Sequence, residues 1–271
     1  MTPKEFGQAL RRRQRLYGTQ ITSISPRVVE AMKGAGLDFV FIDTEHTPID
    51  RVTVSWMCQA YRNAGLPPMV RIPEPDPYQA CMVLDGGAAC VKVPYVETAE
   101  QARQMVGATK FRPFKGKRLE SLLSGEKPAP HVAEYIRTHN ENFSLVLNIE
   151  SVAGMENLGE ILAVPGVDGI IIGPHDLSCS IDAPEDYRGP AFDAATRKIL
   201  ARCRDAGISA GLHVHHADCV DNEIAWANAG ANIILHSADL KLFRQTLVKD
   251  ITRLRDTLGD KQSAGGSSGT F

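Results

Sequence analysis

Residues 39–72 carry the pattern that decides the fold: FVFID (39–43), a segment of helical period, VTVSWMCQAYRNAG (52–65), and PMVRI (68–72). The two short runs are apolar almost throughout, which is typical of parallel strands buried on both faces. The glycine that ends the helical segment supplies the left-handed C-cap that stops a helix before a strand. The stretch therefore predicts one strand–helix–strand unit.

The same unit recurs along the chain. Between helical segments, several of which end in an Ala-Gly step, lie eight strand candidates: ITSIS from Ile21, FVFID from Phe39, PMVRI from Pro68, CVKVPYV from Cys90, SLVLNIE from Ser144, DGIIIG from Asp168, SAGLHV from Ser209 and ANIILHS from Ala231. Length alone allows one large domain or two small ones. Eight alternating strands and helices favour a single α/β (β/α)8 TIM barrel over an open doubly wound sheet. We predict this barrel over residues 1–259.

Three segments fall outside the repeat. Residues 111–144, between the fourth and fifth strand candidates, predict an enlarged loop and an extra helix at the C-terminal face of the barrel. The long segment from Asp239 predicts a helix that packs one full apolar face, formed by Leu240, Phe243, Leu247, Ile251, Leu254 and Leu258. Residues 260–271 are polar and rich in Gly and Ser, which predicts a flexible tail.

Composition excludes several classes of protein. Among 271 residues, 43% are hydrophobic and 23% charged, which rules out disordered and fibrous chains. A net charge of -2 predicts no general attraction to nucleic acid or anionic membranes, so we expect a small-molecule partner. No run approaches a membrane helix, and the N-terminus lacks the apolar core of a signal peptide, so we expect a soluble cytoplasmic protein. The six scattered cysteines are expected to be reduced core residues, not a disulfide framework or a zinc site.

Polar side chains close several of these apolar strands, and burying them there without a role is costly. The ends of the fifth and sixth strands carry Glu150 and Asp176, with no cation near either in the sequence. Two neighbouring carboxylates share a proton or a metal, and oxygen ligands suit Mg²⁺ or Mn²⁺, with Co²⁺ or Zn²⁺ as further options. The alternative is that each carboxylate caps the helix that follows it.

Other polar residues at strand ends allow two interpretations each. His46 is a general base or a loop histidine. Arg71 meets an anionic substrate, or it forms a structural ion pair with Asp43 or Asp76. The turn from Gly173 presents backbone N–H groups as an anion cradle. The segment HVHH from residue 213 is expected to line the pocket instead of binding zinc, because it lacks nearby cysteines and helical ligand spacing.

Four motifs together resemble the HpcH/HpaI family of metal-dependent class II pyruvate aldolases: FIDTEH, MVRIP, LNIE and IIGPHDLS. Their order and separations agree with the family, and the resemblance runs from about Ile21 to Leu258. It implies a (β/α)8 barrel that assembles as a homohexamer and exchanges its last helix between neighbours. It also implies a lyase that forms a pyruvate-type enolate from a 2-oxo acid and adds it to, or releases it from, an aldehyde.

The resemblance also assigns roles to residues. Glu150 and Asp176 would hold the divalent metal, and Arg71 would stabilise the enolate oxygen. His46, held by Asp85, would be the base, acting through a water on the metal. Asp43 would support the site. The substrate would also meet Asn148 and the backbone of the turn Gly173, Pro174, His175 and Asp176.

Several positions depart from the family pattern. Asn148 stands where Gln is usual, and His175 replaces a small residue. The segment GKRLESLLSG departs from GxRGxG, and further histidines stand at positions 213, 215 and 236. We expect these changes to surround the aldehyde, so that enolate chemistry is retained with an unusual second substrate. The alternatives are an oxaloacetate decarboxylase or another enolate-trapping synthase, and a non-catalytic barrel that binds a small carboxylate.

Overall fold

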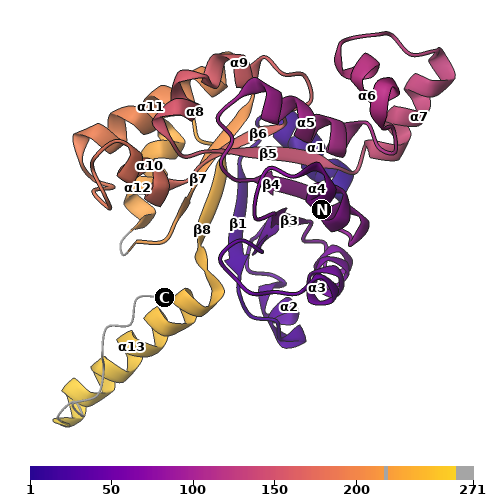
Figure 1. Ribbon diagram of the computed structural model, residues 1–271. Coiled ribbons are helices and arrows are strands. Elements are labelled where there is room, and N and C mark those ends of the chain that lie inside the picture. Colours follow the sequence, from indigo (N-terminus) through magenta and orange to yellow (C-terminus); the bar gives the residue numbers. More distant parts are fainter. Residues whose placement is uncertain (217–218, 261–271) are drawn as a thin grey trace.

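The structure is a computed structural model that describes residues 1–216 and 219–260. Eight parallel strands close into a barrel in chain order, with helices around it, so the predicted (β/α)8 fold is confirmed (Figure 1). The strands are β1 (Leu16–Ile21), β2 (Phe39–Asp43), β3 (Pro68–Arg71), β4 (Cys90–Val93), β5 (Ser144–Ile149), β6 (Gly169–Ile172), β7 (Ser209–Val214) and β8 (Ile233–Ala238).

Several helices begin where the sequence supplies a capping side chain. Asp50 accepts the amides of Val52 and Thr53 at the start of α3, and Thr98 forms a capping box with Gln101 at α5. The helices are α1 (Pro3–Arg11), α2 (Pro26–Met32), α3 (Arg51–Asn63), α4 (Pro77–Asp85), α5 (Ala99–Lys110), α6 (Gly116–Leu123), α7 (Pro130–Asn140), α8 (Val152–Glu156), α9 (Leu158–Leu162), α10 (Pro174–Ser180), α11 (Pro190–Asp205), α12 (Cys219–Asn228) and α13 (Asp239–Leu258). In the described part of the chain, none of them has both the length and the apolar character that crossing a membrane requires.

The first strand lies earlier than predicted. β1 runs from Leu16 to Ile21 and pairs with β2 and β8, so it ends where the predicted strand ITSIS begins. The amides of Thr22 and Ser23 donate to the Asp239 carboxylate instead of a neighbouring strand. The sequence LYGTQI is not a continuous apolar run, so its composition does not indicate a buried strand.

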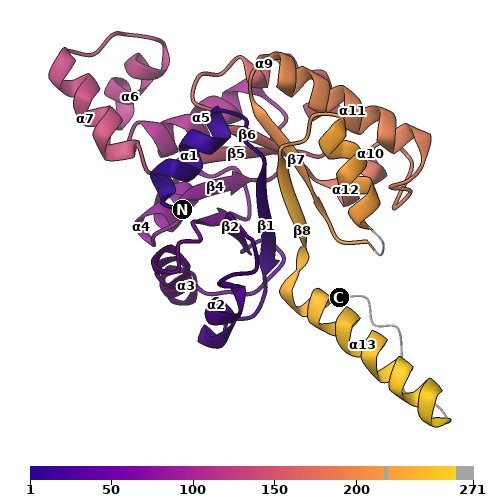
Figure 2. The same ribbon diagram turned by 180° about the vertical axis from the view of Figure 1, so that it is seen from behind.

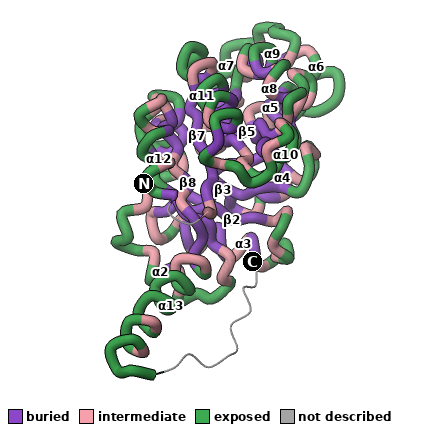
Figure 3. Tube along the Cα trace, turned by 90° about the vertical axis from the view of Figure 1, so that its left-hand side faces the viewer, coloured by how far each residue is buried: buried purple, intermediate pink, exposed green. Residues whose placement is uncertain are grey.

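The barrel interior changes character along its axis. Apolar side chains fill its N-terminal part, which α1 closes. The cluster consists of Phe6, Ala9 and Leu10 from α1 and of Leu16, Phe39, Phe41, Met69, Cys90, Val146, Ile171, Ile233 and Leu235 from the strands. A second, larger apolar layer lies between the outer face of the barrel and the helices. Figure 3 shows the buried strands surrounded by helices with exposed outer faces. Buried polar side chains, including Asp43, Arg71, Lys92 and Asn148, occupy the C-terminal part of the interior. The chemistry of a TIM barrel belongs at this end.

The insertion between β4 and β5 lies at the opposite end from the one predicted. α5 carries the chain back to the N-terminal end of the barrel before α6 and α7 begin, and both helices project there (Figures 1 and 2). Asn140 donates to the carbonyl of Arg112, which ties the end of α7 to the end of α5. Leu119 and Glu120 therefore lie away from the mouth of their own barrel, and the expectation that they flank the aldehyde there is wrong within one chain.

The last helix leaves the barrel. α13 projects from the end of β8 (Figure 1), and Asp239, which anchors it to Thr22 and Ser23, is its only buried residue. The apolar side chains at 240, 243, 247, 251, 254 and 258 are all exposed, Phe243 to 64%. The predicted apolar face exists, but none of the residues in 1–216 and 219–260 covers it. The predicted tail falls outside the described residues from 261 onward.

Gly211 on β7 provides a test of barrel closure. A Cβ there would lie 1.7 Å from the backbone oxygen of Ile233 on β8, so Gly211→Ala must separate two paired strands. We expect it to lower the free energy of unfolding by about 3 kcal/mol, measured by urea denaturation. In the control Gly159→Ala, the new Cβ meets only the end of the flexible Arg202 side chain, so a change below about 0.5 kcal/mol is expected. Equal effects in the two variants would contradict this account.

Candidate active site

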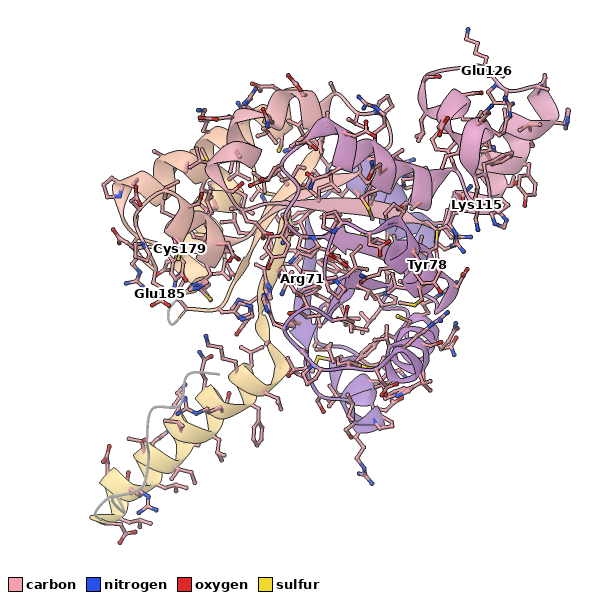
Figure 4. All side chains as sticks on the ribbon, viewed as in Figure 1. Arg71, Tyr78, Lys115, Glu126, Cys179 and Glu185 are labelled. Atoms are coloured by element: carbon pink, nitrogen blue, oxygen red, sulfur yellow. The ribbon has the colours of Figure 1, made fainter. Side chains whose placement is uncertain are left out.

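Arg71 lies at the centre of the polar end of the barrel (Figure 4). Its Nε and Nη2 donate to the two oxygens of Asp43 at 2.8 and 2.6 Å, and Nη1 forms an ion pair with Glu45 at 2.9 Å. Burial raises the pKa of Asp43, but the hydrogen bonds and charge of Arg71 outweigh it and bring that pKa below its ordinary value. The guanidinium is thus fixed in direction and remains charged.

The structural ion pair predicted as the alternative role of Arg71 is confirmed. The ion pair with Asp43 exists, whereas Asp76 accepts the amide of Tyr78 and caps α4. Glu45 completes the arrangement, because it also accepts the hydroxyl of Tyr95 from the loop after β4. Glu45, in the motif FIDTEH, and Tyr95, in the strand candidate CVKVPYV, have no predicted role. All three nitrogens of the Arg71 guanidinium thus contact these two carboxylates at the C-terminal end of β3.

Glu150 is buried and held by two donors. The amide of Tyr95 donates to Oε1 at 2.7 Å, and the side-chain amide of Asn148 donates to Oε2 at 2.8 Å. A Cβ at position 173 would lie 2.3 Å from Oε2, so Gly173 is required for this close approach. Burial raises the pKa of Glu150, and the charge of Asp176 adds to the rise. The two carboxylates are therefore electrostatic neighbours, as predicted.

The capping alternative is not what the structure shows. Ser151, not Glu150, caps α8, because its hydroxyl accepts the amide of Gly154. Asp176 stands in the first turn of α10 but accepts no hydrogen bond among the described residues. The side-chain oxygen Oδ1 of Asn148 is also buried without a hydrogen-bond partner in the described chain. Two carboxylates and a carbonyl oxygen thus offer unused lone pairs at one place, which fits a hard divalent cation.

Lys92 is a cation near Glu150 that the sequence did not predict. It points from β4 into the barrel, is buried, and lies with Nζ 4.3 Å from the centre of the Phe41 ring. Burial, with the charge of Arg71 as the next cause, lowers the pKa of Lys92 to about 7. The feature of the sequence that indicates this buried cation is a lysine inside the apolar run CVKVPYV.

The histidines divide between the two sides of the barrel wall. His213 and His215 lie together, with Nε2 of His215 3.2 Å from Nδ1 of His213, and burial lowers the pKa of both, that of His215 to about 4. His216 stacks instead on Tyr187, so it does not join His213 and His215. His236 does not face the pocket, because its ring bonds Glu223 on α12, outside the barrel. His175 is exposed, with Glu185 as its ionic neighbour.

The pairing of His46 with Asp85 does not occur within this chain. His46 is 62% exposed, with Nε2 3.5 Å from Glu45. Asp85 is the last residue of α4, which runs from the mouth of the barrel back to its N-terminal end, and there it pairs with Arg112. The two residues therefore belong to opposite ends of the barrel.

The backbone cradle at residues 173–176 is smaller than expected. Pro174 has no N–H, and the amide of Gly173 donates to the carbonyl of Ile149. The amides of His175 and Asp176 begin α10 and have no acceptor among the described residues. Two backbone donors thus face the mouth beside Glu150.

Comparison with known proteins places the chain in a family. The family model of the HpcH/HpaI aldolase/citrate lyase family matches residues 17–246. A hydroxypyruvate/pyruvate aldolase from Roseovarius nubinhibens is 32% identical over 250 residues, 92% of this chain and 96% of that protein. A 2-keto-3-deoxy-L-rhamnonate aldolase from Klebsiella pneumoniae is 30% identical over 257 residues, 95% of each chain.

The solved structures agree as well. A crystal structure of a family member from Burkholderia cenocepacia superposes with a TM-score of 0.80 at 29% identity, covering 93% of this chain and 99% of that one. The family model spans most of the chain, and the relatives align along nearly their whole length. The resemblance inferred from four short motifs is confirmed: the chain belongs to the HpcH/HpaI aldolase/citrate lyase family.

Proposed function

We propose that this protein is a metal-dependent carbon–carbon lyase of the aldolase type. It forms a pyruvate-type enolate from a 2-oxo acid and adds it to, or releases it from, an aldehyde. The observation that carries the proposal is the buried Glu150, held by Tyr95 and Asn148 and facing Asp176. The relatives named as aldolases support the same reaction class.

Glu150 and Asp176 would hold the divalent metal. Their oxygen donors suit Mg²⁺ or Mn²⁺, with Co²⁺ or Zn²⁺ able to substitute. When bound, the metal lowers the energy of negative charge that develops on the keto oxygen. Asn148 keeps Glu150 oriented through its amide, as the family's usual Gln would with a longer reach.

The cations of the site would act on the substrate directly. Arg71, fixed by Asp43 and Glu45, would donate to the enolate oxygen as charge develops there. Lys92 has no ion pair in the described chain and would meet the carboxylate of the 2-oxo acid from the barrel floor. The amides of His175 and Asp176 would bind the same carboxylate from the rim. The substrate would thus lie between these groups with its methyl toward the mouth.

His46 would remove the proton from that methyl group, because it is exposed at the mouth and Glu45 lies beside it. Asp85 could orient His46 only from a neighbouring subunit, since within the chain it lies at the far end of the barrel. This requirement agrees with the proposed homohexamer, in which α13 covers a neighbouring barrel. None of the six cysteines forms a disulfide in the described chain, and Cys179 is exposed, which supports the proposed cytoplasmic setting.

Replacing the buried ligand tests the metal site. Glu150→Gln keeps the shape but loses the charge, so we expect metal-dependent deuterium exchange at the pyruvate methyl to fall at least about 100-fold, measured by NMR with each metal. The control Glu160→Gln changes an exposed carboxylate on α9 and should leave exchange unaltered. Full exchange in Glu150→Gln, or no exchange in the wild type with any metal, would contradict the proposal. Exchange without cleavage of any aldol would favour a decarboxylase or synthase.

Lys92 makes stability depend on pH in metal-free protein. Its folded pKa, about 7, lies below the ordinary 10.5, so between these values the unfolded chain binds a proton that the folded chain lacks. Stability should therefore rise with pH across this window. Lys92→Met removes the cost of burial, so we expect a higher melting temperature than the wild type at pH 7, with the difference shrinking toward about pH 10. Lys198→Met, on the exposed side of α11, is the control. A difference in melting temperature between Lys92→Met and the wild type that stays constant at all pH values would contradict the lowered pKa of Lys92.

The exposed face of α13 predicts the assembly. Light scattering after size-exclusion chromatography should find a hexamer for the wild type. Leu247→Asp puts a charge in the apolar face and should give smaller species, because the face would be buried between subunits. Lys249→Asp introduces the same side chain on the opposite face of the helix and should remain a hexamer. A wild-type monomer would refute the exchange.

A further inference from the structure

A cluster of three possible metal ligands lies outside the barrel wall. Cys219 and Glu223 stand one helical turn apart on α12, so both side chains project from one face of that helix. His236 points from β8 toward this face, while its neighbour Leu235 points into the barrel interior. The cluster is therefore separated from Glu150 and Asp176 by the wall of the barrel.

The ligand atoms converge on one point. Nδ1 of His236 lies 2.8 Å from Oε2 of Glu223 and 3.8 Å from Sγ of Cys219, and one donor atom of each residue lies within 4.8 Å of the others. In a tetrahedral zinc site with these ligands, donor atoms are separated by roughly 3.3–3.8 Å. Cys219 is buried, and the other two are partly buried. Small side-chain rotations would bring all three to one ion.

The arrangement does not fit a catalytic triad. A nucleophilic thiol and its orienting carboxylate would contact opposite nitrogens of the imidazole ring. Here both approach Nδ1, which can share at most one proton between them. A cation at the centre would instead use a lone pair from each group.

We propose that Cys219, Glu223 and His236 form a second metal site that binds Zn²⁺ through a thiolate, a carboxylate oxygen and an imidazole nitrogen, with water as the fourth ligand. Mixed sulfur, nitrogen and oxygen donors select zinc over magnesium. Cys219 is the first residue of α12, where the helix dipole favours the thiolate. Binding releases the thiol proton to solvent.

The proposed ion would join α12 to the strand that leads into α13. His236 is followed after two residues by Asp239, where α13 begins. The carbonyl of His236 also accepts the hydroxyl of Thr19 on β1. Zinc would therefore fix the end of β8, from which the exchanged helix departs, and its role would be structural. The site does not depend on the proposed aldolase activity.

Cobalt titration of the full-length, chelator-treated protein tests the site. Co²⁺ bound to a thiolate gives a charge-transfer band in the near ultraviolet, which a site of carboxylates and water lacks. We expect one equivalent of this band in the wild type, its loss on adding Zn²⁺ and its persistence in excess Mg²⁺. The band should also persist in Glu150→Gln, so failure of the catalytic site would not affect the result.

Variants assign the band. Cys219→Ser should abolish it, whereas Cys179→Ser, which removes the exposed thiol, should keep it. Because Cys219 is buried and its replacement risks misfolding, Glu223→Gln is the second variant. It retains the thiol and should weaken zinc binding at least 10-fold, with the fold checked by circular dichroism. Absence of the band in the wild type, its retention in Cys219→Ser or its loss in Cys179→Ser would overturn the proposal.

Discussion

The burial of charge at one end of a closed barrel is the constraint on which the rest of the structure depends. Removing a charged group from water is costly unless a partner or hydrogen bonds replace the lost solvation. Asp43 and Arg71 meet this requirement with two hydrogen bonds to each other. Glu150 meets it only in part, with two hydrogen bonds but no ion pair among the described residues, and Lys92 forms no ion pair there; burial disfavours the charged form of each. The barrel thus presents one carboxylate that a cation would stabilise and one ammonium group that an anion would stabilise.

The sequence predicted those parts of the fold that depend on local apolar patterns. Seven of the eight strands lie where continuous apolar runs placed them, and β1 was displaced because LYGTQI is paired with two strands without being apolar. The insertion after α5 was assigned to the wrong end, because counting from β4 ignored the helix that carries the chain back. The position of a strand can be predicted from composition. The end of the barrel at which an insertion lies depends on every helix and strand that precedes it in its repeat.

The candidate site was predictable where a polar residue closes a strand. Arg71, Glu150 and Asp176 come together because parallel strands bring their carboxyl ends to one face. Lys92 was not predicted because it lies within an apolar run. Adjacent strand residues point alternately to the interior and to the helices, and His236 takes the outward position next to the inward-facing Leu235. Asp85 shows the limit of a motif, because the residue that the family resemblance pairs with His46 lies at the far end of the barrel within this chain and pairs there with Arg112.

The chain carries two donor sets of different chemical softness, and this difference affects how its metal content is interpreted. Glu150 and Asp176 offer only oxygen, whereas Cys219, Glu223 and His236 offer sulfur, oxygen and nitrogen. Zinc binds more tightly than magnesium or manganese to a mixed set, so it would occupy the outer site first and remain there through purification. Zinc found in the isolated protein would therefore not identify the metal that serves the barrel mouth. A catalytic metal would have to be assigned by a reaction at the substrate, because total metal content would sum the two proposed sites, which differ in ligands and in purpose.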